Sequence, residues 1–183
     1  IWDVFMAPVT GMIGNKATTG AIGIALFILV IGGFLGVVNQ TGALNDGIRA
    51  VVHNSKGHEK RMIVILTIIF ALGGSTYGMG EETIAFFPLL VPVMMAVGYD
   101  SLVAAGVILL GTRVGDLAST VNPFSTGVAS AMIKISPGEG LGSRIILLVI
   151  VTGMTIFFIL HYADKIKKDP TKSLVYAQRA EDE

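Results

Sequence analysis

The chain has 183 residues, of which 52% are hydrophobic and only 14% charged, and its mean hydropathy is +0.74; a soluble domain carries roughly 25% charged residues, so this composition favours a membrane protein. Thirteen basic and thirteen acidic residues leave no net charge, which excludes the basic surface of a nucleic-acid-binding protein. The absence of cysteine excludes disulfides, thiolate metal sites and cysteine nucleophiles.

We expect the chain to be a piece of a longer polypeptide, because it opens with Ile1 instead of methionine. Residues 1–20 are predicted to form an external N-terminal segment. Residues 21–61 are predicted to contain a scaffold-type transmembrane helix followed by a cytoplasmic loop. The helix is indicated by an uncharged run over 21–38, close to the roughly 20 residues that a crossing needs. Basic residues between Arg49 and Arg61 place the loop in the cytoplasm.

Residues 62–98 are predicted to form a re-entrant helical hairpin, which enters and leaves the membrane on one side. The apolar run 62–74 is short for a crossing, and a second apolar run covers 83–98. A polar, glycine-rich tip that contains two glutamates separates them and discourages a continuous helix. Two full crossings would also leave both ends of this segment on the same side of the membrane. The choice of a hairpin therefore depends on the short length of the apolar runs and on the two glutamates between them.

The tip of this hairpin is a candidate substrate site. A carboxylate in the bilayer costs roughly a few kcal/mol, so the paired glutamates indicate contact with substrate or a proton; the alternative is that both are hydrated at the cytoplasmic interface. The positive end of the helix from Thr83 suits a substrate carboxylate. The glutamates favour a cationic group on the substrate and the helix end favours a carboxylate group. A zwitterion or a cationic amino acid carries both groups. The candidate residues are Gly74, Ser75, Thr76, Tyr77, Glu81 and Glu82.

Residues 99–135 are predicted to form a transmembrane helix broken at a proline, which lacks a backbone donor and disfavours helix in the preceding residue. An unwound helix frees carbonyl groups that can bind an alkali cation, while polar side chains beside it contact substrate. A tolerated kink is the alternative interpretation. The candidate residues of the break are Ser119, Thr120, Asn122, Pro123 and Thr126.

Arg113 and Asp116 lie three residues apart on one face of the first part of this helix. They are a candidate ion pair, which either neutralises two charges within the membrane or takes part in gating or substrate contact. The three histidines lie in or beside polar segments without companion ligands, so we predict no metal site, no catalytic residue and no cofactor. A coupling ion, either a proton or sodium, is left open.

Residues 136–163 are predicted to form an external loop and the last transmembrane helix. Residues 164–183 are predicted to form a cytoplasmic tail or a linker to a missing second half, because four lysines follow Tyr162 closely. The predicted fold class is therefore all-α: a polytopic membrane protein with a re-entrant helical hairpin and a broken transmembrane helix.

Three stretches resemble a known carrier family: GGSTYGMGEETIAFFPLLVPVMMAVGYD, STVNPFSTGVAS and YADKIKKDPTKSLVY. Over residues 1–176 the chain closely resembles the N-terminal half of arginine/ornithine antiporter-like members of the four-carbon dicarboxylate anaerobic carrier family, in the ion transporter superfamily. The resemblance implies a multi-pass protein of the bacterial inner membrane and a homodimer whose transport domain moves past a scaffold. It also implies that each half of the carrier supplies one hairpin and one broken helix.

By motif, the same resemblance assigns residues to the substrate site. At position 113 the family would be expected to carry a small or apolar residue, and this chain carries arginine. The residues assigned to the tip are Gly74, Ser75, Thr76, Glu81 and Glu82, and those assigned to the break are Ser119, Asn122, Pro123 and Thr126.

The predicted function is that of a secondary active transporter, or half of one, for small carboxylate-bearing solutes, and not that of an enzyme. The paired glutamates favour basic amino acids over four-carbon dicarboxylates and short-chain fatty acids. An intramembrane aspartyl protease is disfavoured, because Asp100 and Asp116 would lie about 24 Å apart along a straight helix. A non-transporting membrane anchor is disfavoured by the cost of buried glutamates. The expected partners are a small-molecule solute, the lipid bilayer, the missing C-terminal half and a second copy of the carrier.

Overall fold

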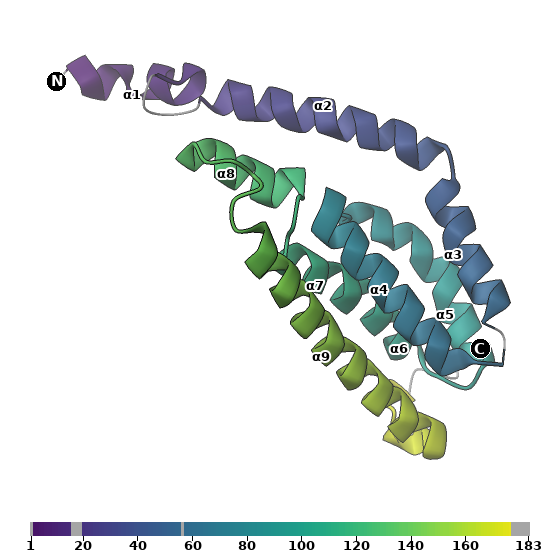
Figure 1. Ribbon diagram of the computed structural model, residues 1–183. Helices are drawn as coiled ribbons and strands as arrows, with labels where there is room; N and C mark the ends of the chain where they lie inside the picture. Colours follow the sequence, from purple (N-terminus) through teal and green to yellow (C-terminus); the bar gives the residue numbers. More distant parts are fainter. Residues whose placement is uncertain (1, 16–19, 56, 177–183) are drawn as a thin grey trace.

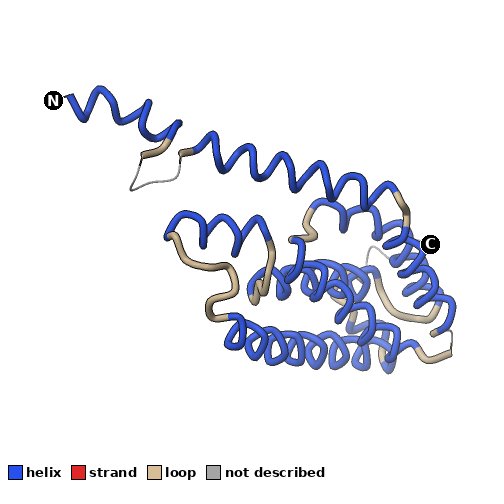
Figure 2. The backbone as a smooth tube through the Cα atoms, turned by 45° about the horizontal axis from the view of Figure 1, so that its top comes forward, coloured by secondary structure: helices blue, strands red, loops and turns tan. Residues whose placement is uncertain are grey.

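The computed structural model describes residues 2–15, 20–55 and 57–176, and the elements in these ranges are all helices (Figure 1, Figure 2). The first part of the chain forms α1 (Trp2–Ile13), α2 (Ala21–Gln40) and α3 (Ala43–Asn54). The second part forms α4 (Glu59–Tyr77), η1 (Glu81–Phe86), α5 (Phe87–Ala96), α6 (Ser101–Ala105), η2 (Gly106–Leu110), α7 (Gly111–Leu117), η3 (Pro123–Gly127), α8 (Val128–Ile133), α9 (Leu141–Lys168) and η4 (Pro170–Lys172).

The helices α1 and α2 form an arm that extends away from the packed helices (Figure 1, Figure 2). The arm is apolar on its exposed surface: Leu29 and Val30 are each 70% exposed and Phe34 is 64% exposed. Water does not favour a helix that is apolar all round, so this arm needs lipid or further protein around it.

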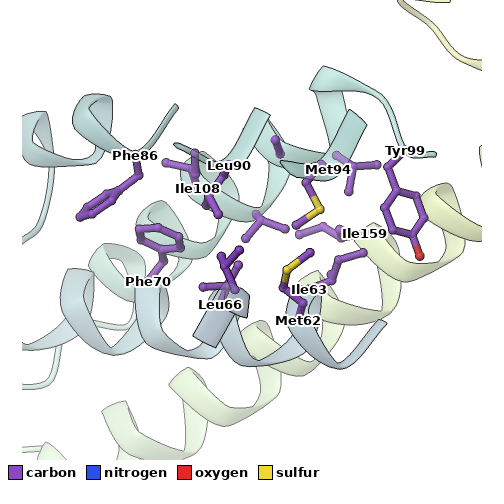
Figure 3. Close-up of a cluster of buried hydrophobic side chains, with 14 of the residues drawn as sticks. Met62, Ile63, Leu66, Phe70, Phe86, Leu90, Met94, Tyr99, Ile108 and Ile159 are labelled. Atoms are coloured by element: carbon purple, nitrogen blue, oxygen red, sulfur yellow. The ribbon is translucent and has the colours of Figure 1, made fainter. Parts of the chain in front are cut away.

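The segments α4 and η1–α5 pack against each other as an antiparallel helical hairpin. The rings of Phe70 and Phe86 meet near its closed end, with centroids 5.5 Å apart. Met62 and Met94 lie toward the open end of the same cluster, with Leu66 and Leu90 between (Figure 3). These six side chains are at most 2% exposed, so burial of apolar surface stabilises the hairpin.

The segment α6–η2–α7 runs parallel to α4, and its α7 part packs against α4 backbone to backbone. A Cβ added at Gly111 would lie 3.3 Å from the carbonyl oxygen of Thr67. One turn further along, a Cβ at Gly115 would overlap the carbonyl oxygen of Ala71. Only glycine allows an approach this close, and the contact fixes how α7 is aligned along α4.

The helical segment that begins at α6 is interrupted before Pro123. Residues 101–117 are continuously helical, residues 118–122 are not, and the chain resumes as η3 and α8. The interruption was predicted at this position from the sequence, because proline has no N–H to continue the helix.

Several helices differ from the sequence prediction. The connection after α2, treated as a loop, contains the helix α3, whose Ile48 and Val52 lie four residues apart on one buried face. The last helix begins before its apolar run and continues to Lys168, so the lysine-rich segment is largely helical. Within the described residues, α4 and α9 are the two helices long and apolar enough to cross a membrane by length and composition.

Candidate functional site

The closed end of the hairpin is shorter than the sequence indicated. The helix α4 continues to Tyr77, so Gly74 and the three residues after it lie in its last turn and not in the loop. The helix ends at Gly78, whose φ of 77° is left-handed and whose N–H bonds the carbonyl oxygen of Gly73. The non-helical tip is therefore residues 78–80.

Ser75 joins the end of α4 to the break in the other helix. Its hydroxyl has one proton, within donating distance of the hydroxyl of Thr120 (3.0 Å) and the carbonyl oxygen of Ala118 (3.2 Å), and it accepts the N–H of Thr120 at 3.1 Å. The carbonyl oxygen of Ser75 accepts the N–H of Thr120 at 3.1 Å and that of Val121 at 3.3 Å. One buried serine thus satisfies much of the unwound backbone.

Asn122 forms the second junction between the last turn of α4 and the break. Its Nδ2 donates to the carbonyl oxygen of Gly74 at 3.0 Å and to Oδ1 of Asp116 at 2.9 Å. Its Oδ1 accepts the N–H groups of Phe124 and Ser125, at 2.9 and 3.2 Å, and so caps η3. Asn122 is 2% exposed, so these four contacts replace the water that a buried amide loses.

The remaining candidates of the break connect its two sides to each other. The hydroxyls of Ser119 and Thr126 lie 2.6 Å apart, and the Thr126 hydroxyl also contacts the carbonyl oxygen of Ser119 at 3.2 Å. Ser125 donates to the Ser119 hydroxyl at 3.0 Å, and Pro123 begins η3. The break is therefore a closed hydrogen-bonded unit rather than a loose kink.

The other candidates of the tip do not enter this network. The hydroxyl of Thr76 donates to the carbonyl oxygen of Leu72 within its own helix, and the Tyr77 hydroxyl is buried without a hydrogen-bond partner in the described part of the chain. The carboxylate of Glu82 accepts the N–H of Gly80 at 3.1 Å. The side chain of Glu81 lies outside the described residues.

The positive helix end expected at Thr83 is a 3₁₀ turn, η1, which begins at Glu81. The N–H of Gly80, just before this turn, is bonded to Glu82, and the hydroxyl of Thr83 donates to the carbonyl oxygen of Gly80 at 2.6 Å. The chain's own carboxylate thus lies where the sequence analysis placed an anionic ligand.

Arg113 and Asp116 form an ion pair, with Nη1 and Oδ2 3.0 Å apart. The Arg113 side chain is 64% exposed and that of Asp116 is 25% exposed. Because Asp116 also accepts from Asn122, the pair is continuous with the junction of tip and break. In the part of the chain that the structure describes, no three acidic or histidine side chains are grouped so as to hold a metal ion.

A second polar cluster lies at the open end of the hairpin and was not predicted. Asp100 accepts the hydroxyls of Tyr162 (2.7 Å) and Ser173 (2.6 Å). Nearby, Lys60 pairs with Asp164 at 2.7 Å, and Lys167 pairs with Glu59 at 3.3 Å. A sequence signal existed: opposite charges stand at the start of α4 and at the end of α9. Both ends of the hairpin are therefore attached to one end of α9.

Comparison with known proteins gives a consistent result. The family model described as "DcuC: C4-dicarboxylate anaerobic carrier" matches residues 2–183. An uncharacterized protein of Haemophilus influenzae is 41% identical over 166 residues, which are 91% of this chain and 33% of that protein. A protein of Escherichia coli named "Putative basic amino acid antiporter YfcC" is 38% identical over 169 residues, 92% of this chain and 33% of its own length.

The chain thus spans about a third of the length of these two curated relatives. No solved structure matches it.

Proposed function

The chain belongs to the C4-dicarboxylate anaerobic carrier family, a family of membrane transporters rather than enzymes, and from this premise we propose that it forms part of a secondary active carrier for small carboxylate-bearing solutes. The proposed substrate site is the junction of the hairpin tip with the helix break. The observation that carries the proposal is the pair of bonds from Ser75 to Thr120 and from Asn122 to Gly74.

The first step concerns depth in the membrane. The helix α9 has 28 residues and is about 42 Å long, enough to cross the bilayer. Ala118, in the break, packs in one cluster with Ala71 of α4 and Leu148 of α9. Leu148 lies about 10 Å from the first residue of α9 and about 30 Å from the last. If α9 crosses, the break and the tip lie within the hydrocarbon layer.

The second step concerns the hairpin. Its two ends contact the same lysine-rich end of α9, through Glu59 and Lys60 on one side and Asp100 on the other. A segment that starts and ends at one membrane surface and turns within the membrane is a re-entrant hairpin, and we propose this form for α4 and α5. Lysines in the last turn of α9 support a cytoplasmic location for that surface.

The third step concerns what irregular backbone does at this depth. Non-helical backbone in a membrane persists where protein buries it or where it lines a water-filled cavity, and carriers place substrate and ion sites at such interruptions. The buried bonds of Ser75 and Asn122 hold the last turn of α4, which precedes the tip, against the break, while the side chains of Glu82 and Arg113 are exposed in part beside them. A second hairpin and break, from the rest of the carrier, would close this side. The further elements of the proposal are a homodimer in the bacterial inner membrane and coupling to a proton or sodium.

Basic amino acids are the proposed substrates, because the tip holds paired glutamates and one relative is named as a basic amino acid antiporter. Four-carbon dicarboxylates are the second candidate, favoured by the family description and by the guanidinium group of Arg113 beside the tip. Short-chain fatty acids are the third candidate, and they offer no cationic group for the glutamates.

Counterflow in proteoliposomes tests the proposal, with the full-length carrier that contains this chain. Vesicles loaded with arginine, ornithine or succinate should accumulate the labelled form of the true substrate. For arginine, Glu82→Gln should lower exchange about tenfold or more, since a charge-assisted hydrogen bond contributes about 1.5–3 kcal/mol. The control, Glu139→Gln in the turn before α9, should leave exchange unchanged. Wild-type vesicles that exchange none of these solutes would refute the substrate class.

Imposed proton and sodium gradients test the coupling ion. The gradient of the true coupling ion should drive uptake of the same solute, and the other gradient should not. If uptake is the same with a proton gradient, with a sodium gradient and without any gradient, coupling to these ions is refuted.

A further inference from the structure

The side chain of Arg113 extends from α7 to the hairpin tip. A Cβ built on Gly80 would lie 3.8 Å from Nη2 of Arg113, so the guanidinium group lies beside the tip loop. Arg113 is twelve residues beyond the start of α6, which places it about 18 Å from the open end of the hairpin. At this depth a charged group is costly unless it faces a partner or a water-filled cavity, and its side chain is 64% exposed.

A continuous chain of hydrogen bonds fixes the orientation of this guanidinium group. Its Nη1 donates to Oδ2 of Asp116, and Oδ1 of Asp116 accepts from Asn122. Asn122 in turn holds the carbonyl oxygen of Gly74 and caps η3. The position of Arg113 therefore depends on the contact between the two interrupted elements.

The same geometry leaves most of the guanidinium group available. Arginine carries five N–H donors in a planar fork, and within the described residues one nitrogen donates to an acceptor. The fork matches a carboxylate in two-point geometry, which a lysine ammonium does not. The competing anion site, the turn before η1, already binds the carboxylate of Glu82.

We propose that Arg113 binds the carboxylate group of the transported solute and that Asp116 positions the guanidinium group of Arg113. This inference rests on the proposed function and assigns the two ends of the substrate separately. Arg113 binds the carboxylate, and Glu82 beside the tip binds the cationic end of the same molecule. A solute without the carboxylate loses the first contact and keeps the second.

The test compares arginine with agmatine, which has the same guanidinium group and no carboxylate, in counterflow with the full-length carrier. Arg113→Gln should raise the KM for arginine about tenfold to a hundredfold, the range expected for losing a charge-assisted pair. It should leave the inhibition constant of agmatine within about twofold. Arg113→Lys keeps the charge without the fork and should give a smaller rise. Arg144→Gln is the control, since Arg144 donates to the carbonyl oxygens of Pro137 and Glu139 in the turn before α9.

An equal change for arginine and agmatine in Arg113→Gln, or no change for either, would overturn the assignment. If Arg113→Gln does not fold, Arg113→Lys decides by the same comparison. A wild-type carrier that exchanges succinate and not arginine would refute the amino-acid substrate alone. Arg113 is then tested with succinate against its diamide, which has no carboxylate, and Arg113→Gln should weaken the binding of succinate more than that of the diamide. A wild-type carrier that exchanges neither refutes the proposed function and Arg113's role with it.

Discussion

The close packing of α7 on α4 makes Gly115 the most sensitive small residue at this interface. A methyl group at Gly115 would overlap the carbonyl oxygen of Ala71 and would lie 2.8 Å from the backbone nitrogen of Ser75. Both neighbours are backbone atoms of a helix, so they cannot rotate away as a flexible side chain can. Gly115→Ala must therefore push α7 and α4 apart by roughly 1 Å to restore ordinary contact distances.

The expected cost follows from three contributions. Overpacking a helix interface costs about 1–3 kcal/mol. Separation also stretches the bonds from Ser75 to Thr120 and from Asn122 to Gly74, which are 3.0 Å long and contribute about 0.5–1.5 kcal/mol each. The higher helix propensity of alanine offsets about 1 kcal/mol of this destabilisation. The net destabilisation is about 3 kcal/mol.

Thermal unfolding of the purified full-length carrier in detergent measures this effect. Gly115→Ala should lower the Tm by roughly 5 °C or more. The matched control is Gly106→Ala in the same helical segment, where an added Cβ would meet Ile159 at an ordinary 3.8 Å. Equal Tm values for the two variants would show that the close approach of α7 to α4 is not the contact that holds the break in place.

Three further substitutions test other parts of the structure. Ser75→Ala removes the buried hydroxyl that contacts Thr120 and the carbonyl oxygen of Ala118 and should destabilise the carrier by about 1–3 kcal/mol, whereas Thr76→Ala should be nearly neutral in the same melting assay. Leu66→Ala opens a cavity in the hairpin core and should cost about 2–5 kcal/mol. Asp100→Asn replaces a charged acceptor of two hydroxyls, so trypsin should cut the tail at Lys172 faster; an unchanged rate would contradict this role for Asp100.

The sequence was sufficient to predict two interruptions, and it located the break before Pro123 correctly. Pro123 and the polar residues before it predicted the break, because proline removes a donor whatever its surroundings are. Glycines predicted the hairpin tip, but they placed it too early. Gly73 and Gly74 are helical, since their lack of a side chain allows α4 to approach α7 and Met79, and this packing offsets their low helix propensity.

The helix α3 was missed for a different reason. Its segment was interpreted from its charges, and Arg49 and His53 indicated only an aqueous location. The apolar residues of the same segment recur with helical spacing, so that Ile48 and Val52 reach the buried cluster while the charged residues face outward. Here the period of the apolar residues carried the structural information, and the net charge did not.

The contact between tip and break depends on how two parallel helices are aligned, which hydropathy does not reveal. Thr67 faces Gly111 and Ala71 faces Gly115 with the same sequence separation, and nearly the same separation brings Ser75 to Thr120. The spacing of four residues recurs on both helices, so each presents a stripe of small residues to the other. Sliding α7 by one turn would place Gly111 opposite Ala71, and the break would lose the hydroxyl of Ser75. The small residues at the contact between α4 and α7 therefore determine which polar groups meet at the break.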